Sequence, residues 1–179
     1  MISCTEFIPS YSELFSYLED NYGRAEVDAF WKYLFVPDGK GIPLISFVEK
    51  EGIHYLGEKY GMDDVKAYLT RYTENVYKQT IADMEVRGLA ALEAKIRDTY
   101  EKEKALDVLT TVLDSNALTV MVTECPAVKH LHETGREVSP WYRYTTEVVM
   151  SVLAKKGGFR FTMESYDEES GAAKYRFEK

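Results

Sequence analysis

The chain has 179 residues, of which 45% are apolar and 29% are charged, and its formal net charge is −8. A chain of this length and composition can bury a sizeable core without disulfides or metals, and it is not expected to be disordered. Acidic residues are spread over both halves and no basic stripe is present, which argues against nucleic acid and anionic membranes as partners.

The N-terminal residues and the apolar runs set the expected location and domain organisation. Residues 1–10 lack a basic segment and an apolar core, so they are not expected to act as a signal peptide. No apolar run is long enough to span a membrane, so the cytoplasm is the expected location. We expect a single domain over residues 1–179, with a helical half at about 1–100 and an α+β half at about 101–179.

The first half predicts helices, because apolar residues recur there at helical spacing. A capping box from Ser10 to Glu13 predicts the start of the first helix, and Gly23 predicts its end. The expected helices cover residues 10–22, 27–35, 43–52 and 55–60, with a turn at residues 37–39. Residues 63–100 continue the helical pattern with a phase slip near Thr80, which leaves open whether they form one helix or two.

The second half changes to the alternating pattern of strands. Leu118, Val120 and Val122 alternate with Thr119, Met121 and Thr123, which predicts a strand. Residues 106–113 are either a partner strand or the end of the preceding helix. Helices are expected at residues 126–134 and 140–156. We therefore expect an α+β fold in which four or five N-terminal helices pack on an antiparallel sheet of three or four strands. Two helices of the second half would cover one face of that sheet.

A C-terminal hairpin is the most specific prediction of the fold. Two alternating segments at residues 159–163 and 173–177 flank a polar connection. If Phe161 faces Phe177 as a buried neighbour, the opposite face brings unlike charges together, and this agreement of both faces predicts the register. The expected charge pairs are Arg160 with Glu178 and Glu164 with Lys174.

Cys125 stands between a predicted strand and a predicted helix that begins at Pro126. Free N–H groups and the helix dipole favour a thiolate at such a position. Cys125 is therefore a candidate catalytic nucleophile with Glu124 as a candidate acid or base, and the alternative is a small buried side chain at a strand–helix corner. His130 and His132 are not spaced to reach the thiol from the same helix or to form a metal pair, so no metal site is expected.

A second candidate site follows at an aromatic segment. Trp141 and Tyr142 could form the wall of a pocket in which Arg143 binds the carboxylate of a substrate. In the alternative interpretation the aromatics only pack against the helix, and Arg143 pairs with Glu147 one turn on. The chain also has 14 tyrosines, which predict core packing with hydroxyls at its edge, or else a dimer surface.

The C-terminal part resembles a known family. An apolar strand leads into Glu124, Cys125, Pro126 and Ala127, and the order then runs through a short helix, an aromatic helix start, a Gly157-Gly158 stop and a hairpin. Over about residues 115–179 this is similar to the bacterial L-2-amino-thiazoline-4-carboxylic acid hydrolases. The family usually has a second cysteine or acid in the aromatic segment, and this chain has neither there.

The first half, with its Asn21-Tyr22-Gly23 and Phe30-Trp31 segments, resembles uncharacterised bacterial proteins rather than any enzyme.

The resemblance implies a hydrolase that opens a cyclic amidine or amide carboxylate, with Cys125 as nucleophile and no cofactor. The alternative from the residues alone is a non-catalytic module that binds or senses a small molecule, with Cys125 in a structural role. A third possibility is a structural interaction protein, such as a homodimer built on the tyrosine-rich helices. Whether the protein is an enzyme stays open at this level.

Overall fold

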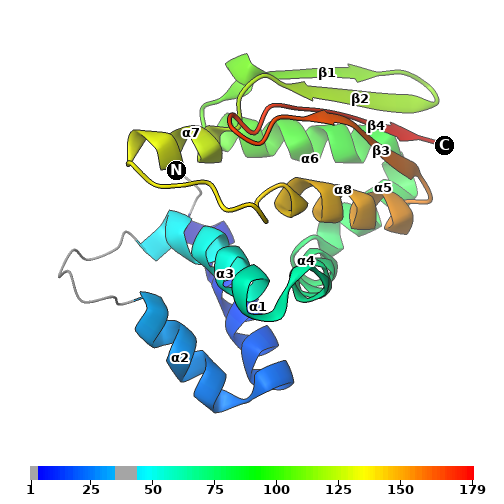
Figure 1. The fold of residues 1–179 in the computed structure, drawn as a ribbon. Helices are drawn as coiled ribbons and strands as arrows, with labels where there is room; N and C mark the ends of the chain where they lie inside the picture. The colour runs from blue at the N-terminus through cyan, green and yellow to red at the C-terminus, as the bar shows by residue number, and fades with distance from the viewer. Residues whose placement is uncertain (1–3, 35–43) are drawn as a thin grey trace.

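A computed structural model describes residues 4–34 and 44–179, and it confirms the expected α+β fold (Figure 1). The turn expected at residues 37–39 lies outside the described residues. The first helices are α1 (Cys4–Tyr22), α2 (Arg24–Leu34), α3 (Leu44–Tyr60), α4 (Met62–Val76), α5 (Lys78–Arg87) and α6 (Leu89–Lys102). A 3₁₀ turn (Leu106–Val108), β1 (Leu109–Leu113), β2 (Ala117–Val122), α7 (Pro126–Glu133), α8 (Tyr144–Lys156), β3 (Arg160–Tyr166) and β4 (Ala173–Glu178) follow.

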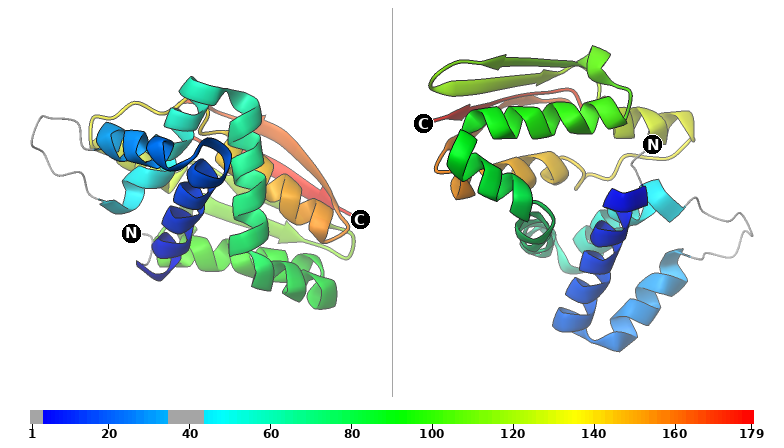
Figure 2. Two further views of the ribbon diagram at one scale, coloured as in Figure 1. Left: turned by 90° about the horizontal axis from the view of Figure 1, so that it is seen from below. Right: turned by 180° about the vertical axis from the view of Figure 1, so that it is seen from behind.

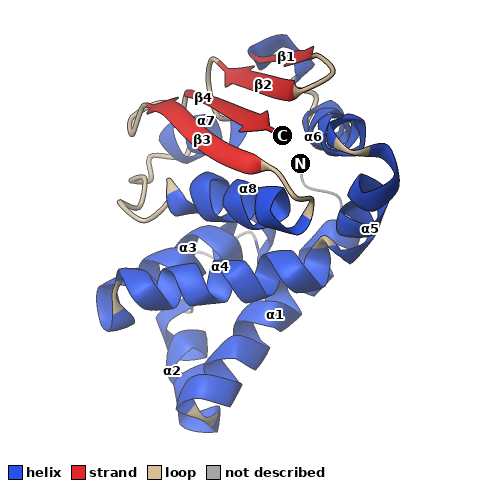
Figure 3. Ribbon diagram, turned by 90° about the vertical axis from the view of Figure 1, so that its right-hand side faces the viewer, coloured by secondary structure: helices blue, strands red, loops and turns tan. Residues whose placement is uncertain are grey.

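These elements are stacked in layers. A four-stranded antiparallel sheet in the order β1-β2-β4-β3 forms the outer layer, and α6 and α8 lie against one of its faces (Figure 3). Helix α4 crosses α8 on the side away from the sheet, and α1 and α2 lie farthest from the strands. Figure 2 shows from behind how α5 joins α4 to α6, so that one hydrophobic cluster extends from the sheet to the N-terminal helices.

Several helix boundaries differ from those expected. Helix α1 begins at Cys4 rather than at the capping box. Helix α3 runs through Gly52 to Tyr60 instead of ending at the glycine. Glycine is needed at position 52 because a Cβ there would overlap the side chain of Leu14. A glycine in mid-helix thus marks a close approach of two helices, not an end.

Residues 63–100 form neither one helix nor two. They divide into the end-to-end helices α4, α5 and α6, which raises the helices before β1 to six in the described part of the chain. The first break falls at Tyr77, whose backbone leaves helical geometry, and the second at Gly88 with φ +60°. The glycine carries a direct sequence signal for a break, and the phase slip of the apolar pattern near Thr80 falls close to the break at Tyr77.

The hairpin register is confirmed. Phe161 pairs with Phe177, and their ring centroids lie 5.4 Å apart. Phe177 is fully buried, whereas Phe161, on the edge strand, is half-buried. Both expected charge pairs form on the opposite face, since Arg160 bonds Glu178 and Lys174 Nζ lies 2.7 Å from a carboxylate oxygen of Glu164. Residues 106–113 are mostly strand, so β1 completes a sheet of four.

The helices that cover the sheet are only partly those expected. Helix α8 covers one face as predicted, but its neighbour there is α6, and α7 lies at the end of the sheet (Figure 1). Helix α6 leads into β1 through a single 3₁₀ turn, so the apolar face carrying Leu92 and Ile96 lies on β1 and β2. Helix α7 has only eight residues and buries only Val128 and Leu131.

No helix among the described residues is long and apolar enough to cross a membrane.

Several tyrosine hydroxyls lie at the edge of the core and bond to carboxylates. The Tyr17 hydroxyl lies 3.2 Å from Oδ1 of Asp64, which also accepts a hydrogen bond from Tyr22. Burial and the neighbouring Asp64 raise the pKa of Tyr17 to about 12. Burial also raises the pKa values of Tyr100 and Tyr175 above the usual range. The folded protein therefore keeps phenol protons that an unfolded chain gives up near pH ~10.

The free energy of unfolding is therefore expected to fall as the pH rises above about 10. Below that pH the tyrosines are protonated in both states, and above it only the unfolded state ionises, so the unfolded state gains stability. Urea midpoints measured from about pH 8 to pH 11 test this, with the ultraviolet absorbance of tyrosinate recorded in parallel. A constant midpoint, or full ionisation of tyrosine in the folded protein near pH ~10, would contradict it.

Candidate functional site

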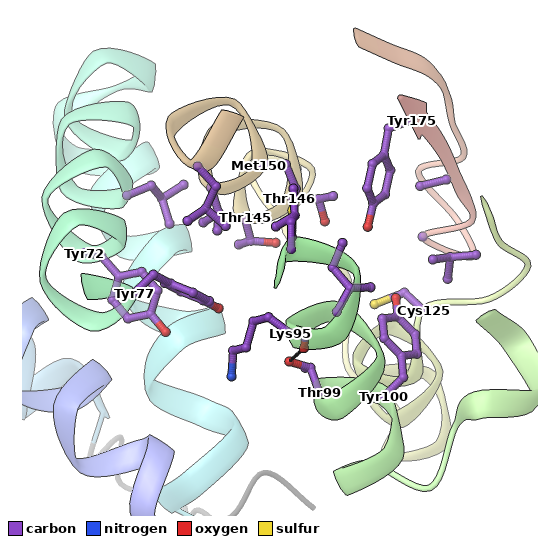
Figure 4. A pocket seen from close by; sticks show the side chains of 18 of the residues that line it. Tyr72, Tyr77, Lys95, Thr99, Tyr100, Cys125, Thr145, Thr146, Met150 and Tyr175 are labelled. Carbon is purple, nitrogen blue, oxygen red and sulfur yellow. Dashed lines mark hydrogen bonds between the residues drawn. The ribbon is translucent and has the colours of Figure 1, made fainter. Parts of the chain in front are cut away.

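A cavity of ≈ 190 Å³ lies between α4, α6, α8 and the inner face of the sheet (Figure 4). Its walls are mostly apolar, and its polar groups gather at two places. The lining residues are Ile53, Tyr68, Leu69, Tyr72, Tyr77, Leu92, Lys95, Ile96, Thr99, Tyr100, Val122, Cys125, Thr145, Thr146, Val149, Met150, Leu153, Gly171, Ala173 and Tyr175. The cavity therefore combines residues from both halves of the chain.

Helical spacing explains how α6 and α8 build these walls. Leu92 and Ile96 lie one turn apart on α6, and Val149 and Leu153 lie one turn apart on α8, so each pair presents one face to the interior. All four side chains are buried. The apolar stripe of each helix thus serves both the core and the cavity.

Cys125 lies at one end of the cavity, which we call the inner end. It occupies the N-cap of α7 with φ −76° and ψ 120°, and Pro126 takes the first helical position, as the sequence predicts. The thiol makes no cap hydrogen bond, and its sulfur lies 3.8 Å from the Tyr142 hydroxyl. The backbone N–H of Cys125 donates to the Ser170 carbonyl at 3.0 Å, which ties α7 to the β3–β4 connection.

Two tyrosine hydroxyls converge on the same inner end. In Figure 4 the hydroxyl of Tyr175 on β4 and that of Tyr100 on α6 both point toward the sulfur of Cys125. Tyr175 is 2% exposed, and neither hydroxyl has a hydrogen-bond partner among the described residues. A buried hydroxyl without a partner costs about 1–3 kcal/mol, and this cost applies most directly to Tyr175, because Tyr100 is half-buried.

The positively charged group of the cavity lies on the side opposite the inner end. Lys95 on α6 is the one charged residue among those that line it, and in Figure 4 its nitrogen lies beside Tyr77. The ammonium group lies 5.7 Å from the centre of the Tyr77 ring and 3.8 Å from a carboxylate oxygen of Asp98. The cavity is therefore neutral at its inner end and cationic at the other.

Gly171 closes the inner end from the β3–β4 connection. Its φ is +65°, and a Cβ built on it would lie 2.5 Å from Cβ of Cys125 and 2.9 Å from a methyl carbon of Val128. A side chain there would meet both a backbone penalty and a steric overlap. Gly171 is thus what allows this connection to approach Cys125.

The other sequence-predicted site residues lie outside this lining, and their proposed roles stay predictions. Glu124 forms an exposed ion pair with Lys129 at 3.1 Å. Arg143 Nε lies 2.8 Å from a carboxylate oxygen of Glu147, the i, i+4 pair of the alternative interpretation, and Nη1 lies 3.7 Å from Glu168. Its guanidinium thus pairs with two carboxylates, and Arg143 is not among the residues that line the cavity.

The two aromatic residues of the second candidate site, Trp141 and Tyr142, lie in different places. The indole nitrogen of Trp141 donates to Glu58 at 3.2 Å, and its ring packs on Gly57 so closely that a Cβ there would overlap it. Tyr142, in contrast, reaches the inner end through its contact with Cys125. The structure therefore brings together Cys125 and Tyr142, and it places Trp141 against α3.

The histidines do not contribute to the cavity. His130 is exposed, and His132 Nε2 lies 2.8 Å from the Glu169 carbonyl oxygen. Among the side chains that the structure describes, at residues 13–33 and 52–179, no three His, Cys, Asp or Glu side chains lie close enough together to hold a metal ion. The residues that line the cavity include no histidine, aspartate or glutamate, so none of them offers an imidazole or a carboxylate to the thiol.

Sequence reasoning missed Tyr100, Tyr175, Lys95 and Gly171 as site residues. Tyr175 had a usable signal, because the alternation of β4 places it on the buried face, where a hydroxyl needs a partner. Tyr100 and Lys95 had none, since a tyrosine and a lysine on an amphipathic helix are ordinary.

No protein-family profile matches this sequence, and no curated protein is significantly similar to it. A solved structure matches in fold: an Fe(II) unliganded H-NOX protein mutant from K. algicida, with a TM-score of 0.52 and 16% sequence identity. The match covers 96% of this chain and 95% of that chain. At this identity the likeness concerns the fold, and it extends over both the helical and the α+β parts.

The resemblance to the L-2-amino-thiazoline-4-carboxylic acid hydrolases is therefore wrong, and with it the description of the chain as hydrolase-like. No profile supports that family or the uncharacterised bacterial proteins suggested for the first half, and the fold is similar to that of an H-NOX protein over nearly the whole chain. The Cys125-Pro126 motif misled because it records a local geometry, a strand that turns into a helix with proline at its first position. Such a junction occurs in many folds.

Proposed function

We propose that this protein is a small-molecule-binding sensory module whose ligand occupies the cavity between α4, α6, α8 and the sheet. The observation that carries the proposal is the pair of unpartnered hydroxyls of Tyr100 and Tyr175, aimed at the inner end of a largely apolar cavity. Buried polar groups in proteins are almost always satisfied, so a ligand that supplies the missing partner accounts for both the space and the hydroxyls.

The composition of the lining favours binding over catalysis. A thiol nucleophile needs a base or an electropositive partner to activate it. Cys125 has neither among the residues that line the cavity, and Lys95 lies at the opposite side. The similarity in fold supports the same proposal, because the H-NOX neighbour is described as unliganded and is therefore a protein that takes a ligand.

The Fe(II) of that neighbour raises the question of whether this chain could hold an iron cofactor such as haem. Haem iron is held by histidine, cysteine, methionine or tyrosine, and the cavity offers Cys125, Met150 and tyrosines but no histidine. Haem is at least as large as the drug-sized ligands whose pockets reach about 300–1,000 Å³. A cavity of ≈ 190 Å³ is too small for it, so the residues do not fit haem.

The volume of the cavity instead favours a small organic ligand. An engineered apolar cavity of about 150 Å³ binds benzene, so the ≈ 190 Å³ here would accept a single ring with a small substituent or a short chain. Leu92, Val149 and Leu153 face the cavity and lack van der Waals contacts on that side. A ligand would supply these contacts and would stabilise the folded state.

Thermal unfolding in the presence of monocyclic aromatic probes tests the proposal. At a probe concentration of 100 Kd, binding stabilises by about 2.7 kcal/mol, which for this chain length raises Tm by roughly 5–10 °C. Thr146→Phe, which fills the cavity from α8, should lose the response, and Ser151→Phe, exposed on the same helix, should keep it. Absence of any Tm shift in the unmodified protein, or an undiminished shift in folded Thr146→Phe, would overturn the proposal.

A further inference from the structure

We infer that the ligand is a small neutral carbonyl compound, a ketone or an aldehyde, whose oxygen accepts hydrogen bonds from Tyr100 and Tyr175 while its apolar body fills the cavity. This inference rests on the proposed function and adds the chemistry of the ligand. It follows from the donors at the inner end, the absence of charge there, and the volume.

The donors define the partner. Each phenol can donate one hydrogen bond, and a carbonyl oxygen has two lone pairs, so one oxygen can accept from both hydroxyls at once. In Figure 4 the two hydroxyls approach the inner end from opposite sides, Tyr175 from the sheet and Tyr100 from α6. An oxygen between them would satisfy two groups that have no partner among the described residues. A hydrocarbon in the same place would leave both unpaired.

An alcohol fits less well than a carbonyl. Its oxygen can accept the same two hydrogen bonds, but its own proton then needs an acceptor. The other polar atoms at the inner end are the sulfur of Cys125, which is a weak acceptor, and the Tyr142 hydroxyl, which lies 3.8 Å from that sulfur. A carbonyl oxygen needs donors alone, and the two phenols supply them.

Charge excludes an anion at this end. Lys95 is the one cationic residue of the lining, and it lies on the other side of the cavity. Arg143, which lies outside the lining, is paired with Glu147 and Glu168, and its guanidinium lies 6.0 Å from the centre of the Tyr166 ring. A carboxylate buried between Tyr100 and Tyr175 would lack a counter-charge, so a neutral oxygen is favoured.

Three probes of one shape separate these possibilities. Acetophenone carries the carbonyl, α-methylstyrene replaces its oxygen by a CH₂ group, and benzoate carries a negative charge. Their dissociation constants are measured by calorimetry on the full chain. Acetophenone should bind at least about tenfold more tightly than α-methylstyrene, because a site built to donate hydrogen bonds discriminates against the analogue that lacks the acceptor.

Matched variants assign the preference to the two hydroxyls. Tyr175→Phe and Tyr100→Phe should each reduce the ratio of the two affinities toward one, chiefly by weakening acetophenone. Tyr144→Phe is the control, because the Tyr144 hydroxyl contacts the sulfur of Met62 and not the cavity. It should leave the ratio unchanged. Circular dichroism establishes that each variant is folded.

The outcomes distinguish this inference from the proposed function. Equal binding of acetophenone and α-methylstyrene, or an unchanged ratio in both Tyr→Phe variants, overturns the carbonyl assignment and leaves a ligand-binding cavity standing. Tightest binding of benzoate overturns the neutral oxygen in the same way. No binding of any probe to the unmodified protein overturns both.

Discussion

Replacing Phe177 by alanine is expected to lower the free energy of unfolding by about 3–5 kcal/mol. Phe177 is fully buried on β4, where it packs against Phe161 and Tyr175 and belongs to the cluster that includes α6 and α8. The loss combines the transfer of the ring to water with the cavity that the backbone of a central strand cannot close. Since the whole fold is stabilised by only about 5–15 kcal/mol, this is a large fraction.

Phe161→Ala is the matched control, because Phe161 faces Phe177 in the same sheet but lies on the edge strand and is half-buried. Its loss should be clearly smaller, since less surface returns to water and the neighbours can relax into the gap. Urea unfolding followed by circular dichroism gives both values. Equal losses for the two variants would contradict the placement of Phe177 at the centre of the core.

Gly171→Ala is expected to lower the free energy of unfolding by about 2–5 kcal/mol, which is more than Gly135→Ala should cost. About 1–2 kcal/mol comes from forcing a Cβ into the left-handed region at φ +65°. A further loss of about 1–3 kcal/mol comes from the overlap with Cys125 and Val128. Because both neighbours belong to the junction that forms the inner end, the same substitution should also reduce probe binding.

Gly135→Ala separates the two contributions. Gly135 has nearly the same φ, +68°, but a Cβ there would meet nothing within 4 Å. It should therefore show only the backbone penalty of about 1–2 kcal/mol, without an effect on binding. Chemical denaturation of the two variants measures the difference between them. If Gly135→Ala costs as much as Gly171→Ala, the close approach of the β3–β4 connection to Cys125 is not what requires glycine.

The sequence predicted those parts of the fold that depend on local periodicity. The hairpin register could be derived because its two faces carry independent signals, the apolar pair Phe161 and Phe177 and the charge pairs opposite them. The Cys125 junction could be derived because proline at the first helical position has a direct physical cause. Both are decided by residues that are neighbours in sequence or in one hairpin.

The remaining parts depend on contacts between distant segments. Gly52 was expected to end a helix because glycine commonly does so. Its packing against Leu14, which is the actual reason for a glycine there, is not visible in the sequence. The phase slip near Thr80 indicated an irregularity close to Tyr77, but whether the helix ends there depends on the packing of α4 and α6 on different elements. Local rules set which segments are helical, whereas tertiary contacts set where some of those helices end.

The candidate site shows the same division. Cys125 was found from its local motif, but Tyr100 and Tyr175 are 75 positions apart and meet only because α6 and β4 pack on the same cavity. Arg143 was expected to bind a substrate, yet its position one turn before Glu147 also allowed the ion pair that it makes. A cavity is a property of the packed fold, so its lining cannot be derived from periodicity alone.

The free energy of unfolding of Tyr175→Phe, measured without ligand against Tyr17→Phe, tests the central claim most directly. The Tyr17 hydroxyl bonds to the carboxylate of Asp64, so its removal should cost about 1.5–3 kcal/mol. The Tyr175 hydroxyl has no partner among the described residues, so its removal should leave the free protein equally stable or more stable. A loss for Tyr175→Phe as large as that for Tyr17→Phe would contradict the account, because the protein itself would then satisfy the hydroxyl that we assign to the ligand.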